Sequence, residues 1–426
     1  MKKYFCGAVL LMVLMLCSCG KKAEDTTDGA KEIEETKVAV PGDGLEDNIN
    51  DELPETEKNV IAPEEVTEAD ATEGGIENQI DQFLTTMTIQ EKVAQMFIVL
   101  PEAFIGVDVV TSAGEATKAA VDRLPVGGLI YMNPNLQNTE QVRSMLTNLQ
   151  SYSQERIGLP MFTTIDEEGG TVARISGREG FGVPYIGNMS EVGRSGDVSR
   201  AREVGEDMGT YLSDMGFNVD FAPDADVLSN PNNQVVSRRS FGSDPEMVTD
   251  MALAVAEGLQ AHGVYATFKH FPGHGATTDD THAGYAYTNK RLEELKACEL
   301  IPFERGIAEG IPFIMIGHIS VPAVIGDDTP SSLSYTMITD VLRNQMGYDG
   351  IVITDAMNMG AIVQTYSSGE AAVKTIQAGT DIVLMPADFN SAYQGVLQAV
   401  ENGVISTERI DESVRRILKI KLELAS

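Results

Sequence analysis

The chain has 426 residues and a formal net charge of −33 at pH 7. So large a negative charge excludes nucleic acid and anionic lipid surfaces as ligands, because both would be repelled. Of the four cysteines, Cys6, Cys17 and Cys19 lie near the N-terminus and only Cys298 remains in the rest of the chain. A single thiol forms no internal disulfide and no cysteine metal cluster, so stability must come from an ordinary hydrophobic core.

The N-terminus has the pattern of an export signal. Lys2 and Lys3 precede an apolar run over residues 5–16, and Leu16-Cys17-Ser18-Cys19 comes next. The run is too short to span a bilayer, which needs about 20 residues. We expect residues 1–18 to be a lipoprotein signal peptide and Cys19 to be lipidated. This prediction makes the protein extracytoplasmic and anchored to the cell membrane only through its N-terminal lipid. A plain cleaved signal peptide and a buried apolar strand are the alternatives.

The segment 19–80 differs in composition from the rest of the chain. Residues 21–80 contain 19 acidic residues, 5 lysines and no aromatic residue, for a net charge of −14. Such a segment buries too little apolar surface to offset the loss of chain entropy on folding. We therefore expect a disordered acidic tether over 19–80 and one catalytic domain over 81–426.

Short apolar runs alternate with amphipathic stretches throughout this domain. The runs predicted as strands are 93–100, 128–132, 161–165, 218–222, 264–268, 313–317, 350–354 and 381–385. The stretches predicted as helices include 139–156, 199–215, 245–262, 290–309, 335–346 and 406–424, with Ser406 as the N-cap of the last. Strands that are apolar on both faces and alternate with helices indicate a parallel sheet. The pattern predicts an α/β fold with a single (β/α)8 TIM-type barrel, and an open doubly wound sheet is the alternative.

Ionisable residues lie directly after the predicted strands at one end. The run Asp166-Glu167-Glu168 follows the third strand, Asp220 and Asp224 lie at the end of the fourth, and Asp355 follows the seventh. Strand five runs into Lys269 and His270, and strand six ends at His318. In a barrel these strand ends converge on one face, where active sites are built.

The densest signal is the sequence KHFPGHGATTDDTH at residues 269–282. One interpretation is a metal site formed by His270, His274, Asp280 and His282, because these residue types and spacings occur among metal ligands. Pro272 and Gly273 break any helix, however, so they do not hold His270 and His274 on one helical face. The favoured interpretation is a mobile loop that delivers one catalytic imidazole, with no metal and no cofactor.

Two further patterns suit proton transfer and nucleophilic attack. At Asp280-Thr281-His282 a carboxylate lies close enough in sequence to hydrogen-bond the imidazole on a turn, which fixes its tautomer and favours protonation. Asp355 directly follows an apolar strand at the ligand end of the predicted barrel. An exposed loop pair without function and a helix-capping aspartate are the respective alternatives.

Other polar groups suit a ligand rich in hydroxyl groups. Asp166 is an acceptor for hydroxyl donors, whereas Arg174, Arg239 and Lys269 donate to hydroxyl or carbonyl oxygens. A salt bridge at a helix cap is the alternative role for Arg239.

Taken together, these segments resemble glycoside hydrolase family 3, specifically its β-N-acetylhexosaminidase branch, over nearly all of residues 81–426. KHFPGHG followed by Asp-x-His is the most specific part of the resemblance. By this resemblance Asp355 is the nucleophile, His282 is the acid/base with Asp280 behind it, and the sugar-binding residues are Asp166, Arg174, Arg239, Lys269, His270 and His318. The branch often has Asp at the position of Ala276, and Thr354-Asp355-Ala356-Met357 replaces a run with two successive aspartates.

The resemblance implies a retaining β-N-acetylhexosaminidase that acts on terminal N-acetylglucosamine of cell-wall or chitin-type oligosaccharides as a monomer. A histidine acid/base also raises the hypothesis that phosphate competes with water as acceptor. The alternatives are a β-glucosidase or β-xylosidase on the same barrel, a non-catalytic sugar-binding lipoprotein, and a metal-dependent hydrolase.

Overall fold

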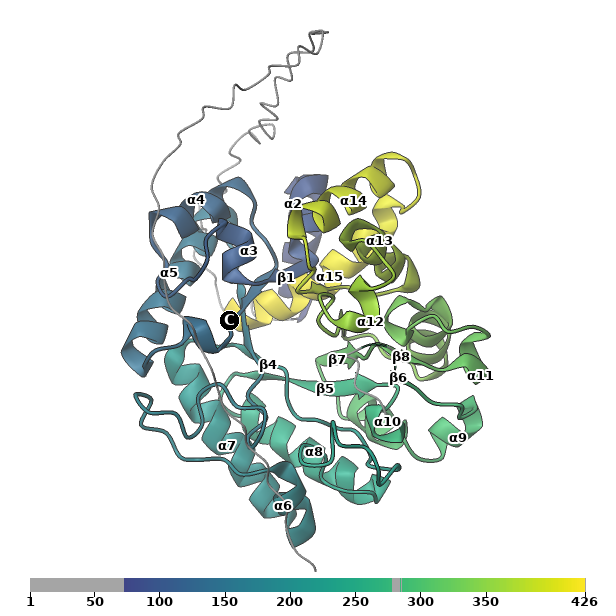
Figure 1. The fold of residues 1–426 in the computed structure, drawn as a ribbon. Coiled ribbons are helices and arrows are strands. Elements are labelled where there is room, and N and C mark those ends of the chain that lie inside the picture. Colours follow the sequence, from purple (N-terminus) through teal and green to yellow (C-terminus); the bar gives the residue numbers. More distant parts are fainter. Residues whose placement is uncertain (1–72, 278–283, 285, 426) are drawn as a thin grey trace, which may run out of the picture. The chain divides into compact units, whose positions relative to one another are not determined.

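The structure is a computed structural model, and it describes residues 73–277, 284 and 286–425 (Figure 1). The predicted signal peptide, Cys19 and the tether up to residue 72 lie outside the described residues. The first described element is the helix α1 (Glu73–Thr86), so helical structure begins before the expected domain start at residue 81. This helix packs on α15 (Thr407–Ala425), where Arg415 pairs with Glu77 at 2.9 Å and with Asp81 at 2.5 Å. That contact with the C-terminal helix explains the earlier start.

Eight parallel strands form the centre of the fold (Figure 1). They are β1 (Phe97–Val99), β2 (Gly128–Ile130), β3 (Phe162–Ile165), β4 (Val219–Asp220), β5 (Tyr265–Phe271), β7 (Phe313–Ile316), β9 (Ile351–Thr354) and β10 (Val383–Leu384). Their order in the sheet is β10-β1-β2-β3-β4-β5-β7-β9. A parallel bridge between Ile353 and Ile382 joins the two ends of this order. The sheet therefore closes, which confirms the predicted (β/α)8 barrel.

Burial explains why the strands read as continuous apolar runs. Every residue of β1, β2, β3, β7, β9 and β10 is buried, because one face of each strand lies in the barrel interior and the other lies under the helices. Aromatic rings fill part of this core. Phe162 of β3 and Phe313 of β7, which are not neighbours in the sheet, meet edge to face with 5.6 Å between their centroids.

Helices and short turns connect these strands. They are α2 (Ile89–Gln95), α3 (Pro101–Ile105), α4 (Glu115–Arg123), η1 (Asn133–Asn135), α5 (Thr139–Ile157), α6 (Met189–Ser195), α7 (Val198–Met215), α8 (Pro245–Gln260), η2 (His274–Ala276), α9 (Leu292–Lys296), α10 (Ile301–Ala308), α11 (Pro322–Ile325), η3 (Ser331–Leu333), η4 (Thr336–Gln345), α12 (Gly360–Val363), α13 (Ser368–Ala378) and α14 (Phe389–Glu401). A separate two-stranded sheet pairs β6 (Ala286–Tyr287) with β8 (Ile319–Ser320). Within the part of the chain that the structure describes, helices that combine the length and apolar character needed to cross a membrane are absent.

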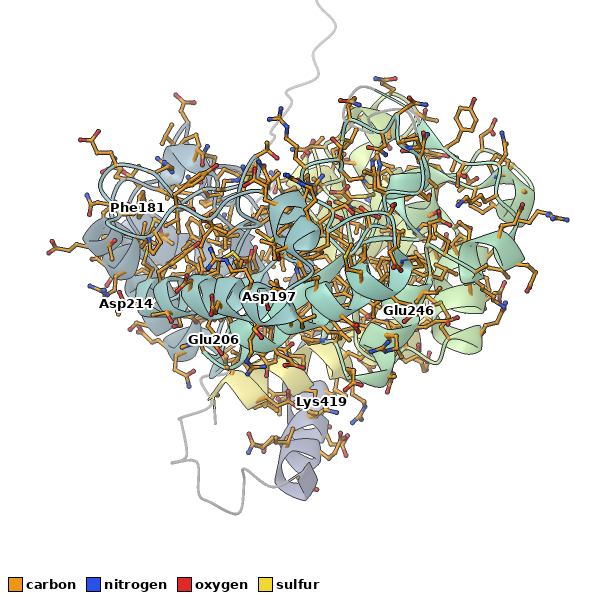
Figure 2. All side chains as sticks on the ribbon, turned by 90° about the horizontal axis from the view of Figure 1, so that it is seen from below. Phe181, Asp197, Glu206, Asp214, Glu246 and Lys419 are labelled. Atoms are coloured by element: carbon orange, nitrogen blue, oxygen red, sulfur yellow. The ribbon has the colours of Figure 1, made fainter. Side chains whose placement is uncertain are left out.

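The helices α7 and α8 approach each other closely at two glycines. A Cβ atom on Gly205 would lie 2.2 Å from the carbonyl oxygen of Val255, and one on Gly258 would lie 2.5 Å from the amide of Glu206. Only residues without a side chain fit at these points. Figure 2 shows α7 along the outside of the barrel, with Asp197 at its N-terminus and Asp214 near its end. Asp197 caps the helix by accepting a hydrogen bond from the Ser199 amide at 3.0 Å.

Two predicted elements differ from the structure for local reasons. Residues 93–95, expected at the start of the first strand, form the last turn of α2. Thr88 and Glu91 make a capping box that begins this helix, and a fully buried apolar run does not by itself distinguish a helix end from a strand. The predicted helix over 290–309 is divided into α9 and α10, and Pro302 lies in the first turn of α10, where its missing N–H is tolerated. Ser406 is the predicted N-cap, and its hydroxyl accepts from the Arg409 amide at 3.2 Å.

A buried carboxylate closes the barrel end from which the strands begin. Asp381 is 0% exposed, and its oxygens accept from the Val352 amide at 2.9 Å and the Ser413 hydroxyl at 2.7 Å. Arg343 pairs with the same carboxylate, and Arg416 lies 3.3 Å from it. Burial alone would raise the pKa of Asp381, but the surrounding guanidinium groups outweigh it and hold the pKa below its usual range. The carboxylate thus joins β9, η4 and α15 in one charged contact.

Asp381→Asn is expected to lower the free energy of unfolding by about 3 kcal/mol at pH 7, because it leaves buried guanidinium groups without their anion. Because the folded-state pKa of Asp381 is lowered, its contribution is present above the unfolded pKa of about 4 and is lost as pH falls through the folded pKa. Chemical denaturation at pH 7 and at acid pH measures both effects. Asp349→Asn is the matched control, because Asp349 pairs with the same Arg416 but is 90% exposed. Equal destabilisation by the two substitutions would contradict this account.

Candidate active site

The carboxyl ends of the strands bring together the residues singled out in the sequence. Asp166 follows β3, Lys269 and His270 lie in the second half of β5, and Asp355 follows β9. Because neighbouring strands are parallel, these positions lie at the same end of the barrel. The structure therefore confirms the expected clustering at strand ends, while the chemical role of each residue stays a prediction.

A buried ionic network forms the floor of this site, with Glu168 at its centre. The Glu168 carboxylate accepts two hydrogen bonds from Arg239, at 2.7 and 2.8 Å, and pairs with the Lys269 ammonium at 2.6 Å. All three side chains are largely buried, at 1%, 11% and 3% exposure. Burial alone would raise the pKa of Glu168, but the two cations outweigh it and lower the pKa well below its usual range. Glu168 is therefore a permanent anion that fixes two cationic side chains.

Asp166 and Arg174 lie at the more exposed edge of the same network. Asp166 accepts a hydrogen bond from Lys269 at 2.9 Å, and its other oxygen lies 3.8 Å from Arg174. Each of these two side chains is 20% exposed. The Nε atom of Arg174 is buried without a hydrogen-bond partner among the described residues. The Asp166 carboxylate, an acceptor, and the exposed part of Arg174, a donor, are thus available side by side for a polar ligand.

The loop that carries Arg174 is held by the neighbouring Glu167. Its carboxylate accepts from the backbone amides of Arg174 at 2.5 Å, Ile175 at 3.0 Å and Ser176 at 2.7 Å. The hydroxyl of Tyr211, on α7, donates to the same carboxylate at 2.9 Å. Burial raises the pKa of Glu167, and these four donors act against it. Glu167 therefore holds the loop in position, and Glu168 holds the side chains of Arg239 and Lys269 in position.

His270 occupies a buried position between an acid and a guanidinium. Its Nδ1 lies 2.8 Å from Asp226, and its Nε2 lies 3.2 Å from Arg239. Because Arg239 only donates, Nε2 must be the acceptor and Nδ1–H must donate to Asp226. Burial, followed by the charge of Arg239, lowers the pKa of His270 to about 4. His270 is therefore neutral near pH 7, with one defined tautomer.

The metal interpretation of this region has a partial structural basis. Ligand atoms of Asp224, Asp226 and His270 lie within 4.8 Å of one another. The Arg239 guanidinium, however, already contacts His270 and lies 3.3 Å from Asp224. It supplies positive charge where a cation would bind. The set proposed from the sequence included His274, whose amide donates to Asp226 at 2.5 Å, together with Asp280 and His282, which lie outside the described residues.

Asp355 is half-buried and interacts electrostatically with two histidines. Its Oδ1 accepts from the amide of Ala356 at 2.7 Å, and its own amide donates to the carbonyl of Ile316 at 2.9 Å. Burial acts to raise the pKa of Asp355, but charge interactions with His318 and His270, the Ala356 amide and Lys269 outweigh it, so the pKa is lowered. The carboxylate is ionised at neutral pH, as a nucleophile must be.

His318 follows β7 and is 0% exposed. Its Nδ1 lies 2.7 Å from the Ser332 hydroxyl, and its Nε2 lies 2.9 Å from the carbonyl of Ala356. The sequence placed this residue among the sugar ligands, and that role stays a prediction. The contacts in the structure connect its ring to the backbone beside Asp355.

Asp280 and His282, the predicted acid/base pair, lie outside the described residues. The structure does describe the residues that flank them. The carbonyl of Thr277 accepts from Asn230 at 3.2 Å and Asn233 at 3.0 Å. On the other side, β6 pairs with β8 directly beyond His318. Both flanks of this segment are therefore attached at the same end of the barrel as Asp355.

The sequence analysis assigned no role to three residues that organise the site. Glu167 and Glu168 were noted only as ionisable residues that follow the third strand beside Asp166. Asp226 had no comparable signal, because it lies in a long connection whose course only the tertiary structure shows.

Glu168→Gln is expected to lower the free energy of unfolding by about 3 kcal/mol at pH 7, because Arg239 and Lys269 then remain buried without their shared anion. Because the folded-state pKa of Glu168 is lowered, the loss should shrink as pH falls below the unfolded pKa of about 4. Urea denaturation of this variant beside Glu179→Gln, an exposed glutamate of the same loop, provides the measurement. Matching midpoints for the two variants would refute the assigned importance of Glu168.

The chain is similar in sequence and structure to known glycoside hydrolases. Residues 88–420 match the Glycosyl hydrolase family 3 N terminal domain. The chain is 36% identical over 329 residues to Beta-hexosaminidase A of Pseudoalteromonas piscicida, and this match covers 71% of this chain and 54% of that protein. It is 35% identical over 271 residues to Beta-hexosaminidase LpqI of Mycobacterium tuberculosis, and this match covers 62% of this chain and 68% of the relative.

A solved structure of a family 3 enzyme is also similar to this chain. The glycoside hydrolase family 3 beta-N-acetylglucosaminidase from Paenibacillus sp. str. FPU-7 matches with a TM-score of 0.75 and 36% identity, over 80% of this chain and 63% of that chain. The chain spans about half the length of the Pseudoalteromonas relative. The family domain nevertheless extends from α2 into α15 and includes every described residue of the ionic network. The chain belongs to glycosyl hydrolase family 3.

Proposed function

We propose that this protein is a retaining β-N-acetylhexosaminidase that removes terminal β-linked N-acetylglucosamine from oligosaccharides. The observation that carries the proposal is the ionised carboxylate of Asp355 at the end of β9, on the same barrel face as the Asp166–Arg174 edge. Relatives and a structural neighbour named for activity on hexosaminides or N-acetylglucosamine support this substrate class.

In the proposed reaction Asp355 attacks the anomeric carbon of the sugar. The bond from that carbon to the leaving oxygen breaks, and His282 gives its proton to that oxygen. A covalent glycosyl-aspartate results. A water molecule then attacks the same carbon, His282 takes the proton, and Asp355 is released with net retention of configuration. Asp280 would hold the His282 ring in one tautomer and stabilise its protonated form.

The ionic network suits recognition of a neutral sugar ring. Asp166 accepts from hydroxyl groups, and the exposed part of Arg174 donates to hydroxyl or carbonyl oxygens. Lys269, Arg239 and His270 are fixed by Glu168 and Asp226 before any ligand arrives. Little side-chain entropy is then lost when the sugar binds. Oligosaccharides of the cell-wall or chitin type are the proposed natural substrates, and the enzyme is proposed to act as a monomer without a metal or a cofactor.

Hydrolysis of 4-nitrophenyl N-acetyl-β-glucosaminide is expected, with the corresponding β-glucoside turned over much more slowly. Asp355→Ala should lower kcat by about 10⁴-fold or more, because no covalent intermediate forms. His282→Ala should remove the basic limb of the pH profile. A folded wild-type protein that cleaves neither glycoside would exclude the proposal and favour a sugar-binding lipoprotein. Preferential cleavage of the glucoside would indicate a β-glucosidase, and loss of activity on chelation would indicate a metal-dependent hydrolase.

The same assay with added inorganic phosphate tests the choice of acceptor. Formation of N-acetylglucosamine 1-phosphate in place of free sugar would identify phosphorolysis, and its absence at millimolar phosphate would identify hydrolysis.

We further propose that the protein is exported and anchored by lipid at Cys19. The proposal rests on the order of features at the N-terminus, where two lysines are followed by an apolar run and then by Cys19. Expression of the full chain in a bacterial host should give a membrane-associated protein that incorporates labelled palmitate. Cys19→Ser should abolish the label and release the protein from the membrane fraction, whereas Cys6→Ser should change neither. Label retained in Cys19→Ser would show that Cys19 is not the lipidated residue.

A further inference from the structure

His318 is completely buried at the end of the barrel that carries the candidate active site. It lies two residues beyond β7, and the strand β8 begins immediately after it. Both ring nitrogens contact protein atoms, the Ser332 hydroxyl at 2.7 Å and the Ala356 carbonyl at 2.9 Å. A buried imidazole that is engaged on both sides is poorly placed to exchange hydrogen bonds with a sugar. Its contacts therefore suggest a task within the protein.

The chemistry of the two partners fixes the tautomer of His318. A backbone carbonyl only accepts, so Nε2 carries a proton and donates it to Ala356. In the neutral ring Nδ1 is then an acceptor, and the Ser332 hydroxyl donates to it. Ser332 itself lies in η3, and its carbonyl accepts from the Thr375 hydroxyl of α13 at 2.6 Å. A chain of hydrogen bonds thus leads from α13 through Ser332 and His318 to Ala356.

Ala356 is the residue whose backbone also contacts the nucleophile. Its amide donates to Asp355 Oδ1 at 2.7 Å, while its carbonyl accepts from His318 at 2.9 Å. The amides on either side are held by neighbouring strands, since Asp355 donates to the Ile316 carbonyl and Met357 donates to the Leu384 carbonyl. The Ala356 N–H and the Ala356 carbonyl belong to successive peptide groups, so a hydrogen bond to the carbonyl acts on the direction of the N–H through the backbone dihedral angles of Ala356.

We propose that His318 is a positioning residue, which donates from Nε2 to the Ala356 carbonyl and so keeps the Ala356 amide directed at the carboxylate of the nucleophile. The inference rests on the proposed role of Asp355. His270 and Lys269 also face Asp355, but both belong to the network of Glu168 and Asp226. His318 is separate from that network, and besides its charge interaction with Asp355 it acts through the backbone of Ala356.

Two amide substitutions separate the two ends of the imidazole. The side-chain amide of Gln reaches to the place of Nε2, so His318→Gln can still donate to Ala356 but loses the contact with Ser332. The shorter His318→Asn reaches to the place of Nδ1, so it retains the Ser332 contact and loses the donor to Ala356. Both variants are neutral and polar, and they differ chiefly in which hydrogen bond survives.

Kinetics on 4-nitrophenyl N-acetyl-β-glucosaminide test the proposal. We expect His318→Asn to lower kcat by about 30-fold with KM within about twofold of wild type, because misplacement of a reacting group affects the chemical step more than binding. His318→Gln should restore kcat to within about fivefold of wild type. The acid limb of kcat/KM should move upward in pH in the Asn variant more than in the Gln variant, because only the former loosens the amide on Asp355.

Other outcomes overturn the inference in distinguishable ways. A rise in KM of similar size in both variants would mean that His318 contacts the sugar, and an equal loss of kcat in both would mean that only its volume matters. Should His318→Asn fail to fold, Ser332→Ala provides the second test, with a smaller loss of kcat at unchanged KM expected beside the control Ser334→Ala in the same turn. A kcat for Ser332→Ala equal to that of wild type would refute the proposed connection from Ser332 through His318 to Ala356. A wild-type protein without glycosidase activity would instead refute the proposed function.

Discussion

Closure of the parallel sheet is the constraint on which the other features depend. Apart from β5, the strands have four residues or fewer, and β4 and β10 contain two residues each, so each of these strands contributes few hydrogen bonds by itself. Closure between β9 and β10 removes the two free edges, and it directs all eight carboxyl ends to one face. At the opposite end, the buried carboxylate of Asp381, just before β10, accepts from the Val352 amide of β9 and pairs with Arg343 and Arg416. The charged contact around Asp381 therefore stabilises the closed barrel, and the closed barrel in turn fixes the positions of the strand ends that form the site.

The site itself is organised by charges that compensate one another away from water. Glu168 pairs with Arg239 and Lys269, Asp166 pairs with Lys269, and Asp226 accepts a hydrogen bond from the neutral ring of His270. Each pair would cost free energy if one partner were missing, so the network holds its members in one arrangement. A sugar then meets donors and acceptors that are already oriented, and the polar groups need little reorganisation when a ligand binds.

The nucleophile receives its support from a different direction. Asp355 is held through backbone atoms, by the amide of Ala356 and the carbonyl of Ile316, and the ring of His318 donates to the carbonyl of Ala356. Membership of glycosyl hydrolase family 3 gives this arrangement its chemical context. The hydrogen bonds that position the nucleophile are thus separate from those of the ionic network, while His270 and Lys269 of that network still act on Asp355 through their charges.

The sequence by itself determined the barrel, its approximate strand positions and the end that carries the site. The alternation of apolar runs with amphipathic stretches, and the polar residues directly after the strands, are local properties of the chain. It also indicated Asp355, Lys269, His270 and Asp166 as members of one site. It did not place 93–95 in a helix, since a buried apolar run has no period that distinguishes the two structures. Only the tertiary structure decided that Glu168 joins two cations, that Asp226 reaches His270, and that His318 connects Ser332 to Ala356. Partners such as Glu168 and Arg239 are far apart in sequence, and their contact depends on where barrel closure brings each strand end.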